Sequence, residues 1–441
     1  MVTAANSGTA NPSITDKHYA ASTPRSGMNR VLFLLTLSVL INYIDRSNLS
    51  IAAPLLKDEL GITASQLGTL LSAFFWSYAL MQIPAGWLVD RFDVKWIFAA
   101  GIFLWTAATG ITGRLHGFTA LLMIRIILGL GESVAFPSYS KVLRGHFKEA
   151  NRGFANAILM TGLALGPAFG MLVGGSAVAR FGWRPFFLAL GIIGLIWLPF
   201  WLLWMPSRPK NQAGVSGSKS GYLDIFCHRS AWGTCIGQSA INYFLYFLVT
   251  WLPFYLVRGR HMSLNEMARA GALVFLMSAA SSAVTGKLSD RWIMAGTSVT
   301  VVRKGVMLAA HIGIGILFCL TVISDGRLFY VMLALTGVFL GMSMCNSWTI
   351  AQILAGPRMV GRWVGVQNFV GNLGGAAAPL LTGLLLDRTG SFYWPFFISA
   401  VVAWIGAIGW CFVIGPLEEV DWEKRRPVGP ATSLSPSPSA P

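Results

Sequence analysis

The sequence predicts an all-α membrane protein with twelve transmembrane helices arranged in two six-helix bundles. Only 11% of its 441 residues are charged and 54% are hydrophobic, whereas soluble domains carry about 25% charged residues. Apolar stretches long enough to cross a bilayer recur along the chain, which excludes a soluble protein and a single-span receptor. The predicted spans cover residues 31–51, 67–88, 96–113, 119–140, 152–177, 184–205, 234–257, 267–288, 303–323, 328–354, 362–386 and 393–414.

The basic residues indicate how the chain is oriented. With twelve spans both termini lie on one side of the membrane, and most of the 33 Lys and Arg lie on that side, in the two tails and the even-numbered loops. Cytoplasmic loops are rich in Lys and Arg, so both termini are expected in the cytoplasm. The net charge of +16 is then an orientation signal, and nucleic acid is not an expected partner.

A long polar stretch between spans six and seven divides the chain into two halves. Parallel six-helix repeats with a binding site between them at mid-membrane are a transporter design. The composition after residue 422 is rich in Pro and Ser, which is typical of disorder. The expected segments are a cytoplasmic N-terminal tail (1–30), an N-terminal six-helix bundle (31–205), a cytoplasmic linker (206–233), a C-terminal six-helix bundle (234–414) and a disordered cytoplasmic tail (415–441).

Each half carries the same short motif at the end of its second span. The motif is Gly86-Trp87-Leu88-Val89-Asp90-Arg91, and it recurs 200 residues later as Gly286-Lys287-Leu288-Ser289-Asp290-Arg291. This G-x-L-x-D-R pattern resembles the signature loop of the major facilitator superfamily, whose fold the twelve spans would match from end to end. The sequence departs from the usual motif at residues 92–95, where a Gly and two basic residues are common.

Asp90, Arg91, Asp290 and Arg291 are the candidate gating residues. Spans five and eleven present their N-terminal ends at the cytoplasmic face, and the helix dipole stabilises a carboxylate there. Such contacts would hold the cytoplasmic side closed. The alternative is that these charged pairs only mark the topology of the chain.

Four charged residues lie well inside the predicted spans: Asp45, Arg46, Arg125 and Glu132. A charge costs about 2.5–3.5 kcal/mol at the centre of a membrane helix, so such residues are functional candidates. The helical rise places Asp45 and Arg125 at matching depth below the external surface. Glu132 lies two turns deeper than Arg125 on the same face of span four.

These four charges sum to zero, and a bound organic anion would disturb the balance. Arg46 and Arg125 carry forked, permanently charged donors that suit a carboxylate. Asp45 and Glu132 are the candidates to take up a proton in compensation, because burial disfavours the charged form of a carboxyl group. These roles predict coupled uptake of an organic anion and a proton. The alternative is two internal salt bridges that only join spans one and four.

Three segments resemble the anion:cation symporter family. They are NYIDRSNLS (42–50), RIILGLGESVAFPS (125–138) and the polar and aromatic residues of 242–255. The family takes up hexonates, hexuronates and aldarates in bacteria and includes sialic-acid and vesicular glutamate transporters of animals. The resemblance implies that the two buried arginines hold the substrate carboxylate and that the two buried carboxylates carry protons. It also implies substrate contacts from Tyr43 and Tyr78.

The C-terminal half supplies uncharged polar groups that suit the hydroxyls of a sugar acid. The candidates are Asn242 and Tyr243 in span seven, and Asn368 and Asn372, one turn apart in span eleven. Such amides also join membrane helices to one another, at about 0.6 kcal/mol each. For any single amide the two interpretations are equally good, with ligand contact favoured for Asn242 and Asn372.

The expected function is proton-coupled import of a small hydroxylated organic anion, such as a hexonate, hexuronate or aldarate, by alternating access. A symporter of aromatic or dicarboxylic acids and a transporter-like membrane sensor are the alternatives. No nucleotide, cofactor or metal is expected, because no GxxxxGK[ST], GxSxG, HExxH or CxxC occurs in the sequence. The only N-x-S/T acceptor, at Asn48, ends a span, which favours a bacterial inner membrane.

Overall fold

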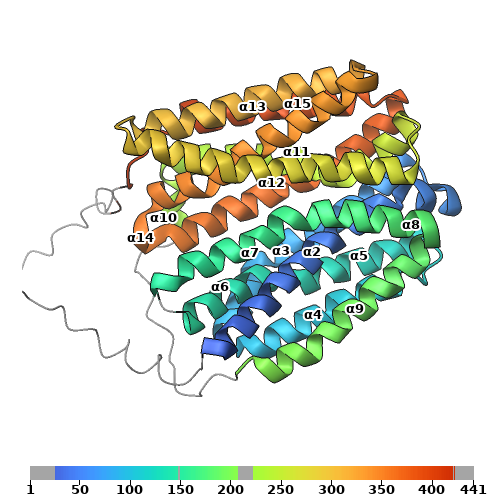
Figure 1. The fold of residues 1–441 in the computed structure, drawn as a ribbon, viewed down its shortest axis with the longest axis horizontal. Coiled ribbons are helices and arrows are strands. Elements are labelled where there is room, and N and C mark those ends of the chain that lie inside the picture. The colour runs from blue at the N-terminus through green and yellow to red at the C-terminus, as the bar shows by residue number, and fades with distance from the viewer. Residues whose placement is uncertain (1–24, 148, 207–221, 421, 423–441) are drawn as a thin grey trace, which may run out of the picture.

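The computed structural model describes residues 25–147, 149–206, 222–420 and 422, and every regular element among them is a helix (Figure 1). Most of both tails and the centre of the expected linker (1–24, 207–221 and 423–441) lie outside these residues. The elements are α2 (Arg25–Leu60), α3 (Ala64–Arg91), α4 (Val94–Thr112), α5 (Phe118–Glu132), α6 (Ala135–His146), α7 (Glu149–Phe169), η1 (Gly170–Gly174), α8 (Gly175–Phe181), α9 (Trp183–Trp204), α10 (Tyr222–Phe226), α11 (Arg229–Phe254), η2 (Tyr255–Gly259), α12 (Leu264–Met294), α13 (Val299–Ile323), α14 (Gly326–Thr389), α15 (Tyr393–Ile408) and η3 (Gly409–Val413).

The all-α class is confirmed for the described residues, and each of the predicted spans falls on helical chain. Ten helical segments are long and apolar enough to cross a membrane. Helices α2 and α3, which contain the first two predicted spans, are 36 and 28 residues long but are not among these ten. In α2 the reason is visible in the sequence, because Asn42, Asp45, Arg46 and Asn48 lie in the middle of the helix and lower its hydropathy.

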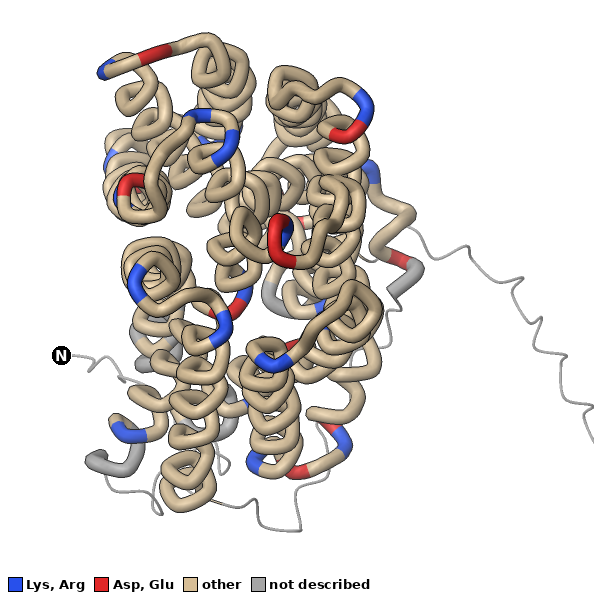
Figure 2. The backbone as a smooth tube through the Cα atoms, turned by 90° about the vertical axis from the view of Figure 1, so that its right-hand side faces the viewer, with Lys and Arg blue, Asp and Glu red and all other residues tan. Residues whose placement is uncertain are grey.

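The helices form two halves that lie side by side. Helices α2 to α9 make up the blue-to-green half of Figure 1, and helices α10 to α15 make up the yellow-to-red half. The halves meet where α2 packs on α11, α3 on α14, and α7 on α12. Figure 2 looks onto one end of this assembly, where most charged residues lie on the turns that connect helices. Charged side chains inside the bundle are therefore exceptional and need an explanation.

In each half a buried tryptophan donates a hydrogen bond to a carbonyl of a neighbouring helix. In the N-terminal half, Trp197 Nε1 donates to the Leu34 carbonyl at 3.1 Å. In the C-terminal half, Trp251 Nε1 donates to the Pro379 carbonyl at 3.0 Å. An indole N–H buried without a partner is costly, so these bonds fix how neighbouring helices pack within a half.

Three local changes of helix geometry in the described chain have a visible sequence cause. The π-helical turns η1 and η2 follow Pro167 and Pro253, which lack the N–H needed to continue the α-helical ladder. Helix α14 contains two of the predicted spans, and it breaks at Gly356, whose φ of 63° favours glycine. Spans ten and eleven are thus joined by a one-residue break without an intervening loop.

The beginning of the expected disordered tail packs against this helix break. The backbone N–H of Val420 donates to the Leu354 carbonyl at 2.9 Å, and Trp422 Nε1 donates to the Ala355 carbonyl at 3.2 Å. Residues 415–420 therefore differ from the prediction of disorder from residue 415. The physical reason is that a broken helix leaves carbonyls without partners, and the tail supplies donors to them.

At the end of the bundle that holds the α2–α3 turn, polar contacts join the two halves. The carboxylate of Asp387 accepts hydrogen bonds from the backbone N–H groups of Ala64 at 2.8 Å and Ser65 at 2.7 Å. Arg258 forms an ion pair with Asp58 nearby. A carboxylate at a helix N-terminus is favourable, so Asp387 holds the start of α3 against the other half.

Candidate functional site

A cavity of about 70 Å³ lies between the two halves. Its wall combines one cationic side chain with aromatic, amide and aliphatic groups. The lining residues are Tyr43, Arg46, Tyr78, Phe136, Leu163, Gln238, Ile241, Asn242, Leu245, Tyr246, Met344, Ser347, Trp348, Asn368 and Asn372. A mainly apolar wall with a few convergent polar groups is typical of small-molecule sites.

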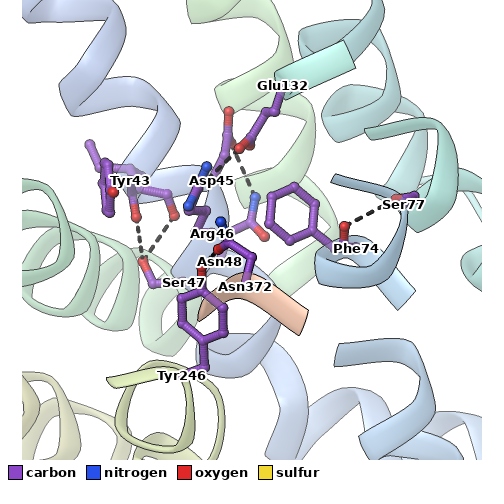
Figure 3. Close-up of polar contacts among 11 residues, drawn as sticks. Tyr43, Asp45, Arg46, Ser47, Asn48, Phe74, Ser77, Glu132, Tyr246 and Asn372 are labelled. Atoms are coloured by element: carbon purple, nitrogen blue, oxygen red, sulfur yellow. Dashed lines mark hydrogen bonds and ion pairs between the residues drawn. The ribbon is translucent and has the colours of Figure 1, made fainter. Parts of the chain in front are cut away.

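Arg46 is the cationic group of the cavity. Its side chain is 5% exposed, its Nε donates to Glu132 Oε2 at 3.1 Å, and its Nη2 makes no hydrogen bond (Figure 3). The guanidinium carbon lies 4.9 Å from the ring centre of Tyr43 and 4.5 Å from that of Tyr78. Tyr43 and Arg46 are three residues apart on α2 and so share a face. Arg46 is therefore held at the cavity wall by one carboxylate and two rings, and its Nη2 is a buried donor without a partner.

Glu132 is fully buried at the C-terminal end of α5 and pairs with Arg46 through one oxygen. Its other oxygen, Oε1, makes no hydrogen bond. A buried carboxylate oxygen without a partner is costly, so the single contact with Arg46 compensates Glu132 only in part.

The other predicted charges, Asp45 and Arg125, lie beside this pair but not on the cavity wall. Asp45 accepts a hydrogen bond from Asn48 Nδ2 at 3.1 Å. Arg125 is 1% exposed, lies 5.2 Å from the ring centre of Phe74, and leaves Nε and Nη1 without hydrogen bonds. It is attracted by Glu132 and Asp45, but no ion pair of 4 Å or less joins it to either carboxylate. Arg125 therefore acts on the charge balance of the cluster rather than lining the cavity.

On the opposite wall, two helices of the C-terminal half meet through Tyr246 and Asn372. The Tyr246 hydroxyl donates to Asn372 Oδ1 (Figure 3), and Asn372 Nδ2 donates to the Asn368 carbonyl at 2.8 Å. The ring of Tyr246 stacks on Phe75 of the N-terminal half with centroids 4.0 Å apart. This contact joins the two halves directly beside the cavity.

A second polar network on this wall is centred on Gln238. Its Nε2 donates to Asn242 Oδ1 at 3.0 Å, and its Oε1 accepts from Ser347 Oγ and from Gln367 Nε2, the latter at 3.1 Å. Gln367 Nε2 also lies 3.2 Å from Ser347 Oγ. The network connects α11 with both parts of the broken helix α14.

The structure brings six of the ten predicted proton and substrate residues into the lining of one cavity. These are Tyr43, Arg46, Tyr78, Asn242, Asn368 and Asn372. Asp45, Arg125 and Glu132 lie behind the wall, and Tyr243 is buried on α11 without lining the cavity.

Sequence reasoning missed Gln238 as a site residue, although a signal was present. Gln238 precedes Asn242 by four residues, so the two amides share one face of α11. The aliphatic lining residues carry no comparable signal, because an apolar side chain in a membrane helix is unremarkable in sequence.

The gating motif of the N-terminal half lies at the end of α3. Asp90 is exposed there, and Lys141 Nζ donates to the Asp90 carbonyl at 3.2 Å and to the Phe92 carbonyl at 3.0 Å. Arg91 lies 5.7 Å from the ring centre of Trp87. Lys141 thus supplies donors to the last carbonyls of α3, which a helix C-terminus requires.

The equivalent motif of the C-terminal half has a different partner. Asp290 forms an ion pair of 2.6 Å with Arg303 of α13, and Arg303 Nη1 donates to Asn346 Oδ1 at 3.0 Å. Arg291 is exposed in the last turn of α12. Sequence reasoning considered the N-terminal end of span eleven as the partner of Asp290 and did not single out Arg303.

Comparison with known proteins identifies relatives over nearly the whole chain. A family model described as "Major Facilitator Superfamily" matches residues 35–379 and 299–438. A "Probable sulfoacetate transporter SauU" of Cupriavidus necator is 31% identical over 89% of this chain and 94% of its own length. The "Hexuronate transporter" of Bacillus subtilis is 30% identical (85% and 91%), and a "Probable L-galactonate transporter" of Escherichia coli is 29% identical (87% and 88%).

A solved structure shows the same fold. It is a bacterial homolog of the human lysosomal transporter Spinster, in an inward-facing and occupied conformation, with a TM-score of 0.74 at 17% identity over 89% of this chain and 97% of that chain. The fold, the family model and the curated relatives agree with one another. The chain therefore belongs to the Major Facilitator Superfamily, among the anion transporters that these relatives represent, and is a membrane transporter and not an enzyme.

Proposed function

We propose that this protein imports a small hydroxylated organic anion together with protons, by alternating access across a bacterial inner membrane. The proposal includes twelve membrane crossings, with α2 and α3 as the first two, and cytoplasmic termini. The observation that carries it is Arg46, which lines the cavity as a cation, with its Nε holding Glu132 and its buried Nη2 without a hydrogen bond. Relatives named as hexuronate and galactonate transporters support an acid of this class.

Competition for Arg46 supplies the coupling. A substrate carboxylate that reaches the Arg46 guanidinium from the cavity shares it with Glu132, so the two negative groups repel each other. A proton on Glu132 removes this repulsion and weakens the Nε contact, because charge-assisted hydrogen bonds are roughly twice as strong as neutral ones. Anion and proton binding are therefore mutually favourable. Asp45 and Arg125 complete the charge balance, with Asp45 nearer the external face in the proposed topology.

The gating residues control which side of the membrane the cavity opens to, and not the binding of the substrate. Asp90 and Arg91 end α3, and Asp290 and Arg291 end α12, all on the proposed cytoplasmic side. The Asp290–Arg303 pair links this end to Asn346, the neighbour of the cavity residue Ser347. A movement of Arg303 at the cytoplasmic end can thus be transmitted to the cavity residue Ser347 through helix α14.

An aromatic or dicarboxylic acid is the second candidate, and one observation favours it. Part of the cavity wall is apolar, through Phe136, Leu163, Ile241 and Met344. Such a wall suits a ring or short carbon chain, whereas the amides opposite suit hydroxyl groups. The identity of the acids that stabilise the protein and are taken up separates the two candidates.

The test is thermal unfolding of purified protein with hexonates, uronates, aldarates, aromatic acids and dicarboxylic acids, followed by uptake of each stabilising acid into proteoliposomes. A ligand of the folded state raises the apparent stability. Arg46→Ala should abolish both responses, while Arg269→Ala, an exposed arginine of α12, should keep them. Stabilisation of Arg46→Ala protein equal to that of wild type would contradict the proposal.

A further inference from the structure

We propose that Gln238 is a positioning residue that sets the hydrogen-bond polarity of the C-terminal cavity wall and so makes the site select hydroxylated acids. This inference rests on the proposed function. It concerns a side chain that joins three helical segments, and it acts through Asn242 and Ser347, which line the cavity beside it.

Gln238 uses both ends of its amide inside the protein. Its side chain is 4% exposed, and its oxygen accepts from two donors, Ser347 Oγ and Gln367 Nε2. Its nitrogen donates to Asn242 Oδ1 at 3.0 Å. If the Gln238 amide rotated by 180°, its NH2 group would face the donor Gln367 Nε2 and its oxygen would face the Asn242 oxygen. The orientation of Gln238 is therefore determined by the network.

That orientation decides what the cavity offers to a ligand. Because Asn242 Oδ1 is occupied by Gln238, the group that Asn242 has left for the cavity is its Nδ2, a donor. The Ser347 hydroxyl hydrogen is directed to Gln238 and Gln367 Nε2 donates to the Ser347 oxygen, so the second lone pair of that oxygen is left as an acceptor. A ligand hydroxyl both donates and accepts, so it matches this pair of groups, whereas a methylene group matches neither.

The network also shows why the loss of Gln238 should matter beyond local packing. Removing its amide leaves the Ser347 hydroxyl and the Gln367 amide without their shared acceptor, and frees the Asn242 amide to rotate. A site built to hydrogen-bond a hydroxyl discriminates strongly against an analogue that lacks it, because its polar groups are then left unpaired. We therefore expect a loss of affinity for hydroxylated ligands, while the contact of the ligand carboxylate with Arg46 stays unchanged.

The experiment compares D-galactonate with hexanoate, which keeps the carboxylate and the carbon number but has no hydroxyl groups. Affinities are measured on purified full-length protein in detergent, for wild type and Gln238→Leu. Gln352→Leu is the matched control, since Gln352 is an exposed glutamine of α14 outside the network. Thermal unfolding of each variant without ligand checks that it is folded.

We expect Gln238→Leu to weaken D-galactonate binding by about tenfold or more, with less than about a twofold change for hexanoate. Equal losses for both acids, or none in folded variants, would overturn the assignment of Gln238. Failure of the wild type to bind any acid would overturn the proposed function as well, so the two failures are distinguishable.

Discussion

Replacing Glu132 by Gln should separate anion binding from proton coupling. Glutamine has nearly the same shape, and its carbonyl oxygen can still accept the Arg46 Nε–H bond that Glu132 accepts at 3.1 Å. It cannot ionise, so the three charges that remain, on Asp45, Arg46 and Arg125, sum to +1 in the variant. The four charges of the wild type sum to zero. The variant should therefore bind the anion at least as well as wild type, because it resembles the protonated transporter.

The size of the effect follows from the charge balance of the site. One pH unit is worth about 1.36 kcal/mol per proton, which is a tenfold concentration ratio. If one proton accompanies each monovalent anion, an inward gradient of two pH units supports an accumulation of about 100-fold. Without the Glu132 proton, the anion should only equilibrate, and the ratio should stay near one when the membrane potential is zero.

The assay is uptake into proteoliposomes with the membrane potential clamped by valinomycin and equal potassium, with and without the pH gradient. Counterflow at equal pH measures binding and exchange without coupling. Glu418→Gln is the matched control, because Glu418 is an exposed glutamate far along the chain from the cavity residues. This control should accumulate the anion like wild type.

Gradient-driven accumulation by Glu132→Gln protein would refute the reasoning, because the proton of Glu132 would then be dispensable. Loss of both counterflow and gradient-driven accumulation would also contradict it, since the variant is expected to keep exchanging the anion. In the first case Asp45 would be the group that carries the proton.

Three further results are expected. Arg125→Gln should lower uptake at least about tenfold, because it leaves the remaining buried charges of Asp45, Arg46 and Glu132 at a net −1 before an anion binds; wild-type uptake would refute this role. In a protein that carries Met344→Cys as a cavity thiol, Asp387→Asn should speed labelling of this thiol by an impermeant reagent. The reason is that a neutral side chain holds the start of α3 less strongly. Unchanged labelling would show that the Asp387 contact does not control access to the cavity. Gly356→Ala should lower the unfolding temperature, because φ is 63° and the new Cβ would collide with the Glu419 carboxylate; an unchanged temperature would mean that the helix break tolerates a side chain without cost.

The sequence by itself determined the membrane class, the two halves and the charged candidates. These features are local, because hydropathy over some twenty residues identifies a membrane helix and a charge within it stands out against its neighbours. The resemblance of three short segments also indicated the family that the comparisons established. None of these inferences required knowing which helices touch.

Only the tertiary structure distinguished residues that look alike in sequence. Arg46 and Arg125 are both buried arginines in predicted spans, but Arg46 lines the cavity and Arg125 lies behind Phe74. Likewise Gln238 became a candidate through contacts with Ser347 and Gln367, which lie more than 100 residues away.

The physical reason is that helical periodicity relates a residue to its own helix but not to its neighbours. The pairing of Arg46 with Glu132 spans 86 residues, and that of Arg303 with Asn346 spans 43. Such contacts depend on how helices rotate and approach one another, which is set by side-chain packing over the whole bundle. The sequence thus indicated the chemistry of the site, and the packing decided which atoms face the cavity.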